Sequence, residues 1–116
     1  MLAYKNRFHN RGRINYVHAH GNNIGGQKIG LVVLETPHHK TDSRFAVIVS
    51  KKVLKNAVGR NRIRRRIYEI IRLHLPKITT KADVLVRVYS KEVIDMPQKE
   101  LIAELTNLLQ KAHMVQ

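Results

Sequence analysis

Length, composition and charge limit the classes of protein to which this chain can belong. Its 116 residues include 22 Lys or Arg against 8 Asp or Glu, a formal net charge of +14 with a pI of about 10.7. Cysteine is absent, which excludes a disulfide framework and a cysteine-ligated zinc site. So large a positive excess opposes compact folding unless a polyanion neutralises it, and we expect a nucleic acid or an anionic membrane as the partner.

The length fits one domain, which we place over residues 1–116. Residues 1–10 lack the apolar stretch of a secretory signal. No run in the sequence approaches the roughly 18 apolar residues that a membrane span requires. We therefore expect a cytoplasmic protein.

Hydrophobic periodicity predicts six main elements. In chain order they are a helix, two strands, a long helix, a strand and a last helix, over residues 11–20, 28–35, 44–50, 57–75, 83–89 and 97–113. The first helix has one face formed by Ile14, Val17 and His18. A short extra strand is expected near Ile24, and a polar loop over residues 37–43 joins the first two strands. Runs of strands interleaved with helices indicate the α+β class.

The two later helices have the clearest amphipathic patterns. Asn56 is a good N-cap for the long helix, Pro76 ends it, and Pro97 fits the first position of the last helix. The inward face of the long helix comprises Ile63, Ile67, Ile70, Ile71 and His74. The apolar stripe of the last helix comprises Leu101, Ile102, Leu105, Leu108, Leu109 and Ala112.

Positive charge is concentrated on the turn before the long helix and on the helix itself. Nine basic residues lie between positions 51 and 72, with Glu69 as the single acid among them. With the isoleucines turned inward, Arg62, Arg65 and Arg72 project outward, whereas Arg60 and Arg64 lie at the edge of the buried stripe. Because the face lacks compensating acids, ion pairs within the helix do not explain it. The pattern favours phosphate binding over an ordinary solvated face.

The segment 45–69, FAVIVSKKVLKNAVGRNRIRRRIYE, contains a strand ending in V-S-K-K, a turn, A-V, and then R-N-R followed by an apolar residue and more basic ones. In these features it resembles the signature region of the bacterial ribonuclease P protein family. Weaker similarity extends over nearly the whole chain.

The resemblance implies a two-layer sandwich of order α-β-β-β-α-β-α, with a left-handed β-α-β crossover around the basic helix. It implies binding to ribonuclease P RNA and to the 5′ leader of precursor tRNA, with cleavage carried by the RNA and its Mg²⁺. No catalytic residue, bound cofactor, metal site or obligate protein partner is then expected of the chain. The implied contacts with the catalytic RNA are Lys51, Lys52, Arg60, Asn61, Arg62, Arg64 and Arg65. The implied leader cleft contains Ile14, His18, Ser50 and Arg87.

Two features depart from the family pattern. The turn at residues 53–56, VLKN, is one residue longer than usual and lacks the customary glycine. Ile14 and His18 stand where the family often has aromatic residues on the first helix, and Tyr16 lies between them on another face.

Other functions fit the residues less well. The eight carboxylates are scattered, which argues against a metal-dependent nuclease site in the protein. The glycine-rich stretch at 21–28 does not match a P-loop, and the seven histidines lack cysteine or acidic partners for a metal site. The alternatives are a stand-alone structural RNA binder, such as a ribosomal protein, and a basic peripheral membrane protein. The R-N-R segment favours the ribonucleoprotein subunit over the structural RNA binder. The membrane protein is disfavoured because the basic helix lacks bulky aromatic residues on a lipid-facing stripe and its isoleucines are needed for the core.

Overall fold

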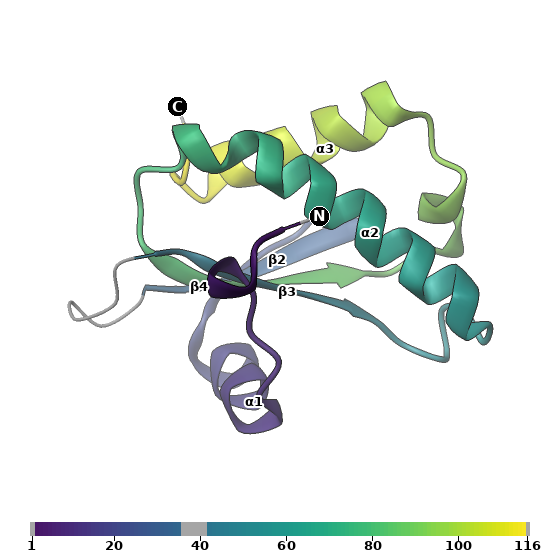
Figure 1. Ribbon diagram of the computed structural model, residues 1–116, viewed down its shortest axis with the longest axis horizontal. Helices are drawn as coiled ribbons and strands as arrows, with labels where there is room; N and C mark the ends of the chain where they lie inside the picture. The colour runs from purple at the N-terminus through teal and green to yellow at the C-terminus, as the bar shows by residue number, and fades with distance from the viewer. Residues whose placement is uncertain (1, 36–41, 116) are drawn as a thin grey trace.

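The computed structural model describes residues 2–35 and 42–115, so most of the predicted loop at 37–43 lies outside the described residues. Three α-helices and a four-stranded sheet dominate this part of the chain (Figure 1). The helices are α1 (Arg11–His20), α2 (Ala57–His74) and α3 (Gln98–Lys111). The strands are β1 (Asn22–Ile24), β2 (Ile29–Glu35), β3 (Arg44–Val49) and β4 (Ala82–Val88). Short 3₁₀ turns are η1 (Tyr4–Asn6), η2 (Leu75–Lys77) and η3 (Lys91–Ile94).

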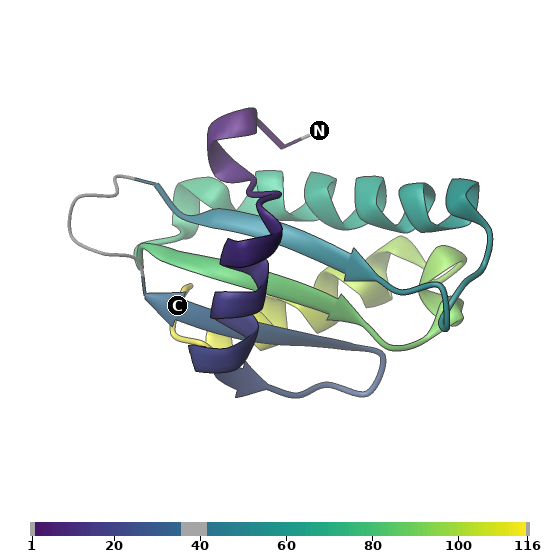
Figure 2. The ribbon, with the colours of Figure 1, turned by 90° about the horizontal axis from the view of Figure 1, so that it is seen from below.

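The sheet has the strand order β1-β2-β4-β3, in which only β3 and β4 pair in parallel. Helices α2 and α3 lie together on one face, and α1 crosses the other face (Figures 1 and 2). The sheet and the α2–α3 layer are the two expected layers, and α1 adds partial cover on the opposite side. The β3-α2-β4 connection is left-handed (Figure 2), as the resemblance implied and against the usual rule.

The predicted elements are confirmed, with differences at their ends. Asn56 caps α2, because its side-chain oxygen accepts hydrogen bonds from the backbone N–H groups of Val58 and Gly59. The α-helix ends at His74 rather than residue 75, and Pro76 lies in the following 3₁₀ turn. Pro97 is the N-cap of α3 and not its first helical residue, so this placement was wrong by one position. The short strand expected near Ile24 is β1.

The main core lies between the sheet and the α2–α3 layer. The four inward isoleucines of α2 are buried against alternate residues of the strands. His74, predicted on the same face, is half-buried and links the two helices, because its Nε2 lies 2.8 Å from the Thr106 hydroxyl of α3. No helix in the described ranges is both long and apolar enough to cross a membrane.

The contact between α1 and the sheet combines a small apolar cluster with a buried ion pair. The apolar cluster consists of Phe8, Val17, Val32, Ala46 and Leu85. Next to it, Asp83 of β4 is completely buried. Its carboxylate accepts a 2.6 Å hydrogen bond from Arg13 Nε of α1, and bonds of 2.9 and 2.6 Å from Arg44 Nε and Nη2 of β3.

These contacts also set the ionisation of the carboxylate. Burial alone would raise the pKa of Asp83, but the hydrogen bonds from Arg44 and Arg13, with their charges, outweigh it and hold the pKa below its ordinary value. The hydrogen bonding between Arg44 and Asp83 also raises the pKa of Arg44. Asp83 is therefore a negative charge held between two guanidinium groups.

Replacing this carboxylate should destabilise the protein, because Arg13 and Arg44 would then face each other without a counter-charge. We expect Asp83→Asn to lower the free energy of unfolding by about 3 kcal/mol, measured by urea denaturation at pH 7. Since the folded-state pKa is depressed, the ion pair stabilises the wild-type chain in full above the unfolded pKa of about 3.9. This stabilisation is lost as pH falls from there through the lower folded-state pKa. Exposed Asp95→Asn is the control and should not shift the urea midpoint. Equal midpoints for the wild type and Asp83→Asn would contradict this role.

Candidate nucleic-acid interface

The basic surface begins at the turn after β3 and continues along the outer side of α2. Lys51 and Lys52 are exposed in that turn, and Arg62 and Arg65 are exposed on the helix. Within the described chain, Arg62 and Arg65 have no acidic side chain within ion-pair distance. The prediction that these two arginines project outward is confirmed, and their charges are available to a ligand.

Asn61 and Arg64 act as a pair on this surface. Arg64 Nη1 donates a 2.7 Å hydrogen bond to the Asn61 side-chain oxygen, one helical turn earlier. The contact fixes the direction of a side chain that would otherwise be free to rotate. Arg64 is half-buried, which confirms its predicted place at the edge of the apolar stripe.

Arg60, the first arginine of the R-N-R segment, is bound to the protein's own backbone. Its Nη1 donates to the carbonyl oxygens of Leu54 at 2.9 Å and Lys55 at 2.7 Å. Leu54 in turn packs over Gly59, where an added Cβ would come within 2.7 Å of the leucine side chain. The turn at residues 53–56 is thus held by Arg60 from one side and by the Leu54–Gly59 contact from the other.

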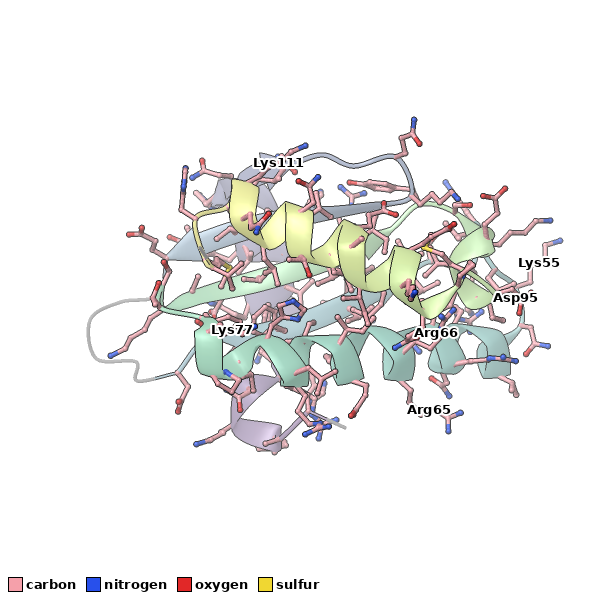
Figure 3. All side chains as sticks on the ribbon, turned by 90° about the horizontal axis from the view of Figure 1, so that it is seen from above. Lys55, Arg65, Arg66, Lys77, Asp95 and Lys111 are labelled. Atoms are coloured by element: carbon pink, nitrogen blue, oxygen red, sulfur yellow. The ribbon has the colours of Figure 1, made fainter. Side chains whose placement is uncertain are left out.

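Arg66 also serves the fold. Its guanidinium donates hydrogen bonds to the carbonyl oxygens of Val93, Ile94 and Met96 and to the side-chain oxygen of Gln98. Figure 3 shows Arg66 turned toward the segment that leads into α3, whereas its neighbour Arg65 points away from the molecule. Sequence periodicity did not reveal this role, because the bonded carbonyls lie about 30 residues further along the chain.

Arg72 is exposed, as predicted, and is paired along the helix with Glu69, the single acid among these basic residues. Arg72 Nε donates a 3.0 Å hydrogen bond to Glu69 Oε1, and the Nη2 atom contacts the same oxygen. The hydrogen bond from Arg72 lowers the pKa of Glu69 to about 2, and the pKa of Arg72 is raised. The uncompensated arginines are therefore confined to the first half of α2.

An open pocket of about 610 Å³ lies between α1, the outer edge of β3 and α2. We call it the edge pocket. Its lining includes Ile14, Ile48, Asn61, Arg64, Arg65 and Tyr68. The sequence had assigned Ile14 to the leader cleft and Asn61, Arg64 and Arg65 to the catalytic RNA. The structure brings the two groups together around the edge pocket, whose floor is apolar and whose walls are basic.

The other three leader-cleft residues lie outside the lining of the edge pocket. His18 is exposed, one turn after Ile14 on the same flank of α1. Ser50 Oγ lies 3.3 Å from the backbone nitrogen of Val53, from which it accepts a hydrogen bond, so this hydroxyl shapes the turn. Arg87 is half-buried on β4, and its guanidinium carbon lies 5.6 Å from the centre of the Tyr89 ring.

Arg87 belongs to a row across the sheet that sequence reasoning did not find. In the strand register it is opposite Gly30 of β2 and Ile48 of β3. Tyr89, 45% exposed, lies across Gly30, where any side chain would displace the tyrosine. Strand alternation alone places Ile48 and Arg87 on the face opposite α2, but only the strand order makes them neighbours.

Comparison with known proteins gives consistent results. The family model described as Ribonuclease P matches residues 2–113. The ribonuclease P protein component of Microcystis aeruginosa is 32% identical over 98% of this chain and 96% of its own length. The corresponding protein of Chloroflexus aurantiacus is 38% identical over 71% of this chain, and the matched region spans 60% of that relative's length.

Solved structures show the same fold. The RNase P protein of Staphylococcus aureus superimposes with a TM-score of 0.81 at 23% identity, covering 96% of this chain and 98% of that one. The RNase P protein of Thermotoga maritima gives a TM-score of 0.79 at 20% identity, covering 90% and 96%. Together with the family match over almost the whole length, these similarities show that the chain belongs to the ribonuclease P protein family.

Proposed function

We propose that the chain is the protein subunit of ribonuclease P, in which it binds the catalytic RNA and the 5′ leader of precursor tRNA. The observation that carries the proposal is the placement of Arg65 in the lining of the edge pocket, with Arg62 exposed on the same helix, in a chain of this family. Neither arginine has an ion-pair partner among the described residues. Phosphates of the catalytic RNA would neutralise these cations and those of Lys51 and Lys52. Arg64, oriented by Asn61, would add a contact of fixed direction.

The chemistry of leader removal would belong to the RNA. Within the described ranges, no group of three or more His, Cys, Asp or Glu side chains is arranged to hold a metal ion. We therefore assign the Mg²⁺ of the reaction to the RNA subunit, where it would activate the attacking water and stabilise the leaving oxygen. The protein would contribute charge neutralisation and substrate positioning.

The leader would lie on the sheet face beside α1. Ile14 and Ile48 offer apolar contact, and Arg87 with Tyr89 offers a cation and an exposed ring on the same face. His18 supplies a second ring from α1. Such a surface suits an unpaired strand, because every base can stack and every phosphate can be neutralised irrespective of sequence.

Reconstitution tests the proposed function. The purified chain, added to its cognate catalytic RNA at low Mg²⁺, should increase the rate of 5′ leader removal from precursor tRNA. The chain without RNA should leave the precursor intact after repurification. A solved mutant of the Staphylococcus aureus RNase P protein has defective mRNA degradation activity. Degradation of an unstructured mRNA by the RNA-free chain should therefore be measured as well. RNA binding without rate enhancement would instead favour a stand-alone structural RNA binder.

The outer arginines should account for part of the salt dependence of RNA binding. We expect Arg62→Ala combined with Arg65→Ala to weaken binding to the catalytic RNA and to reduce the slope of log K against log salt by roughly 0.7–0.9 per lost phosphate contact. Lys99→Ala with Lys111→Ala on α3 removes the same charge and is the matched control. An identical slope change in both double variants would mean that only net charge matters.

Substitutions of the adjacent residues Arg65 and Arg66 should distinguish an arginine that binds RNA from one that stabilises the fold. Arg66→Ala leaves buried carbonyl groups without their donor, so we expect the free energy of unfolding to fall by about 2 kcal/mol, measured by urea denaturation. Arg65→Ala should leave the urea midpoint unchanged and weaken RNA binding. The assignment fails if the two variants are equally stable.

His18 should affect only substrates that carry a leader. We expect His18→Ala to weaken holoenzyme binding to precursor tRNA with a leader of several nucleotides, because one stacking ring is lost, and to leave mature tRNA binding unchanged. Equal losses for both ligands, or no loss for either, would remove His18 from the leader surface.

A further inference from the structure

The two flanks of α1 carry different chemistry. Ile14 and His18, four residues apart, face the side of the edge pocket. Arg13 reaches the opposite way, to the buried carboxylate at the start of β4. Tyr16 and His20 follow Arg13 at three- and seven-residue spacings, which share one side of a helix. We call Arg13, Tyr16 and His20 the outer flank of α1.

The planar groups of the outer flank form a row. The rings of Tyr16 and His20 are stacked, with centroids 4.2 Å apart and planes 23° apart. The guanidinium carbon of Arg13 lies 5.3 Å from the centre of the Tyr16 ring. The His20 ring is held by a 3.0 Å hydrogen bond from its Nδ1 to the Tyr16 carbonyl oxygen. Each member of the row is about one helical turn from the next, so the exposed imidazole of His20 forms the C-terminal end of the row.

The core does not require the two rings of this row. Tyr16 is 49% exposed, His20 is exposed, and Val17 is the buried residue through which α1 packs on the sheet. A pair of side chains stacked on a helix surface contributes only about 0.2–0.5 kcal/mol to the helix. The row is therefore a preformed aromatic surface facing solvent.

The surroundings of the row are positive. Arg13 uses its Nε for Asp83, and its two terminal nitrogens have no hydrogen-bond partner among the residues that the structure describes. Arg13 also lines a pocket of about 290 Å³ with three further cationic side chains and no acidic one: Lys5, Arg7 and Arg44. Asp83, which binds both Arg13 and Arg44, is outnumbered by these four cations. Exposed planar rings next to such an excess of positive charge are the chemistry that binds unpaired nucleobases and their phosphates.

We propose that the outer flank of α1 is a second site for single-stranded RNA, separate from the leader surface on the other flank. An unpaired base would stack on His20 as the next member of the row, and its backbone phosphates would lie toward Arg13. The site requires only an unpaired strand, so it can be tested on the full chain alone, independently of the ribonuclease P role.

The probe is an oligouridylate of about ten nucleotides with one central 2-aminopurine, whose fluorescence falls when the base stacks. We expect Tyr16→Leu and His20→Ala to weaken binding roughly five-fold or more at the outer flank and to reduce the fluorescence quenching measurably, since one stacked base is worth about 1–3 kcal/mol. Tyr16→Phe keeps the ring and should keep both signals. Asn15→Ala, an exposed change on the same helix, is the matched control.

Inorganic polyphosphate separates stacking from charge. Its affinity should be the same for the wild type and His20→Ala, because it carries phosphates and no bases. The proposal is overturned if His20→Ala leaves the quenching intact, if it weakens polyphosphate binding equally, or if the quenching depends on His18 instead. Thermal melting of each variant identifies any loss of fold. If Tyr16→Leu does not fold, His20→Ala still tests the proposal, because His20 is exposed at the end of α1.

The reconstituted holoenzyme then identifies the source of the strand. Weaker assembly of His20→Ala with the catalytic RNA would assign the base to that RNA. A loss seen only with leader-bearing precursor tRNA would assign it to the leader. No loss in either measurement would overturn the site as a functional one.

Discussion

The buried carboxylate of Asp83 is the contact on which the orientation of both flanks of α1 depends. Helix α1 has a weak apolar face, with only Val17 fully buried, so hydrophobic packing alone would orient it poorly. The hydrogen bond from Arg13 fixes its rotation over the sheet, and Arg44 ties the same carboxylate to the start of β3. That rotation turns Ile14 and His18 to one side and Tyr16 and His20 to the other.

Arginines of the same segment differ in function because they differ in their neighbours. Arg60 and Arg66 donate to backbone carbonyls of the turn before α2 and of the segment before α3, so they hold loops in place. Arg62 and Arg65 have no such partner within the described residues and keep their full charge for a ligand. A strongly basic chain can fold when its cationic groups are exposed to solvent or hydrogen-bonded to backbone carbonyl oxygens, so that the core remains apolar.

The position of β3 at the edge of the sheet explains where the basic residues meet the apolar ones. The left-handed crossover carries the chain from this edge strand through α2 to β4. The N-terminal segment covers the first part of the edge, where Phe8 donates to the Phe45 carbonyl oxygen. The edge pocket occupies the part that follows, between α2 and α1. The pocket therefore results from the topology, since its walls come from three separate segments of the chain.

The sequence by itself determined the elements, the N-cap of α2 and the outward direction of Arg62 and Arg65, because these depend on local periodicity and on residues within one helical turn. Its R-N-R segment also determined the family. Only the tertiary structure decided which arginines are free, since the carbonyls bound by Arg66 lie about 30 residues away. It likewise decided that Ile48 and Arg87 are neighbours and that Asp83 lies between two cations. Contacts between strands and helices distant in the chain leave no periodic signal in the sequence, so they are fixed only when the whole chain packs.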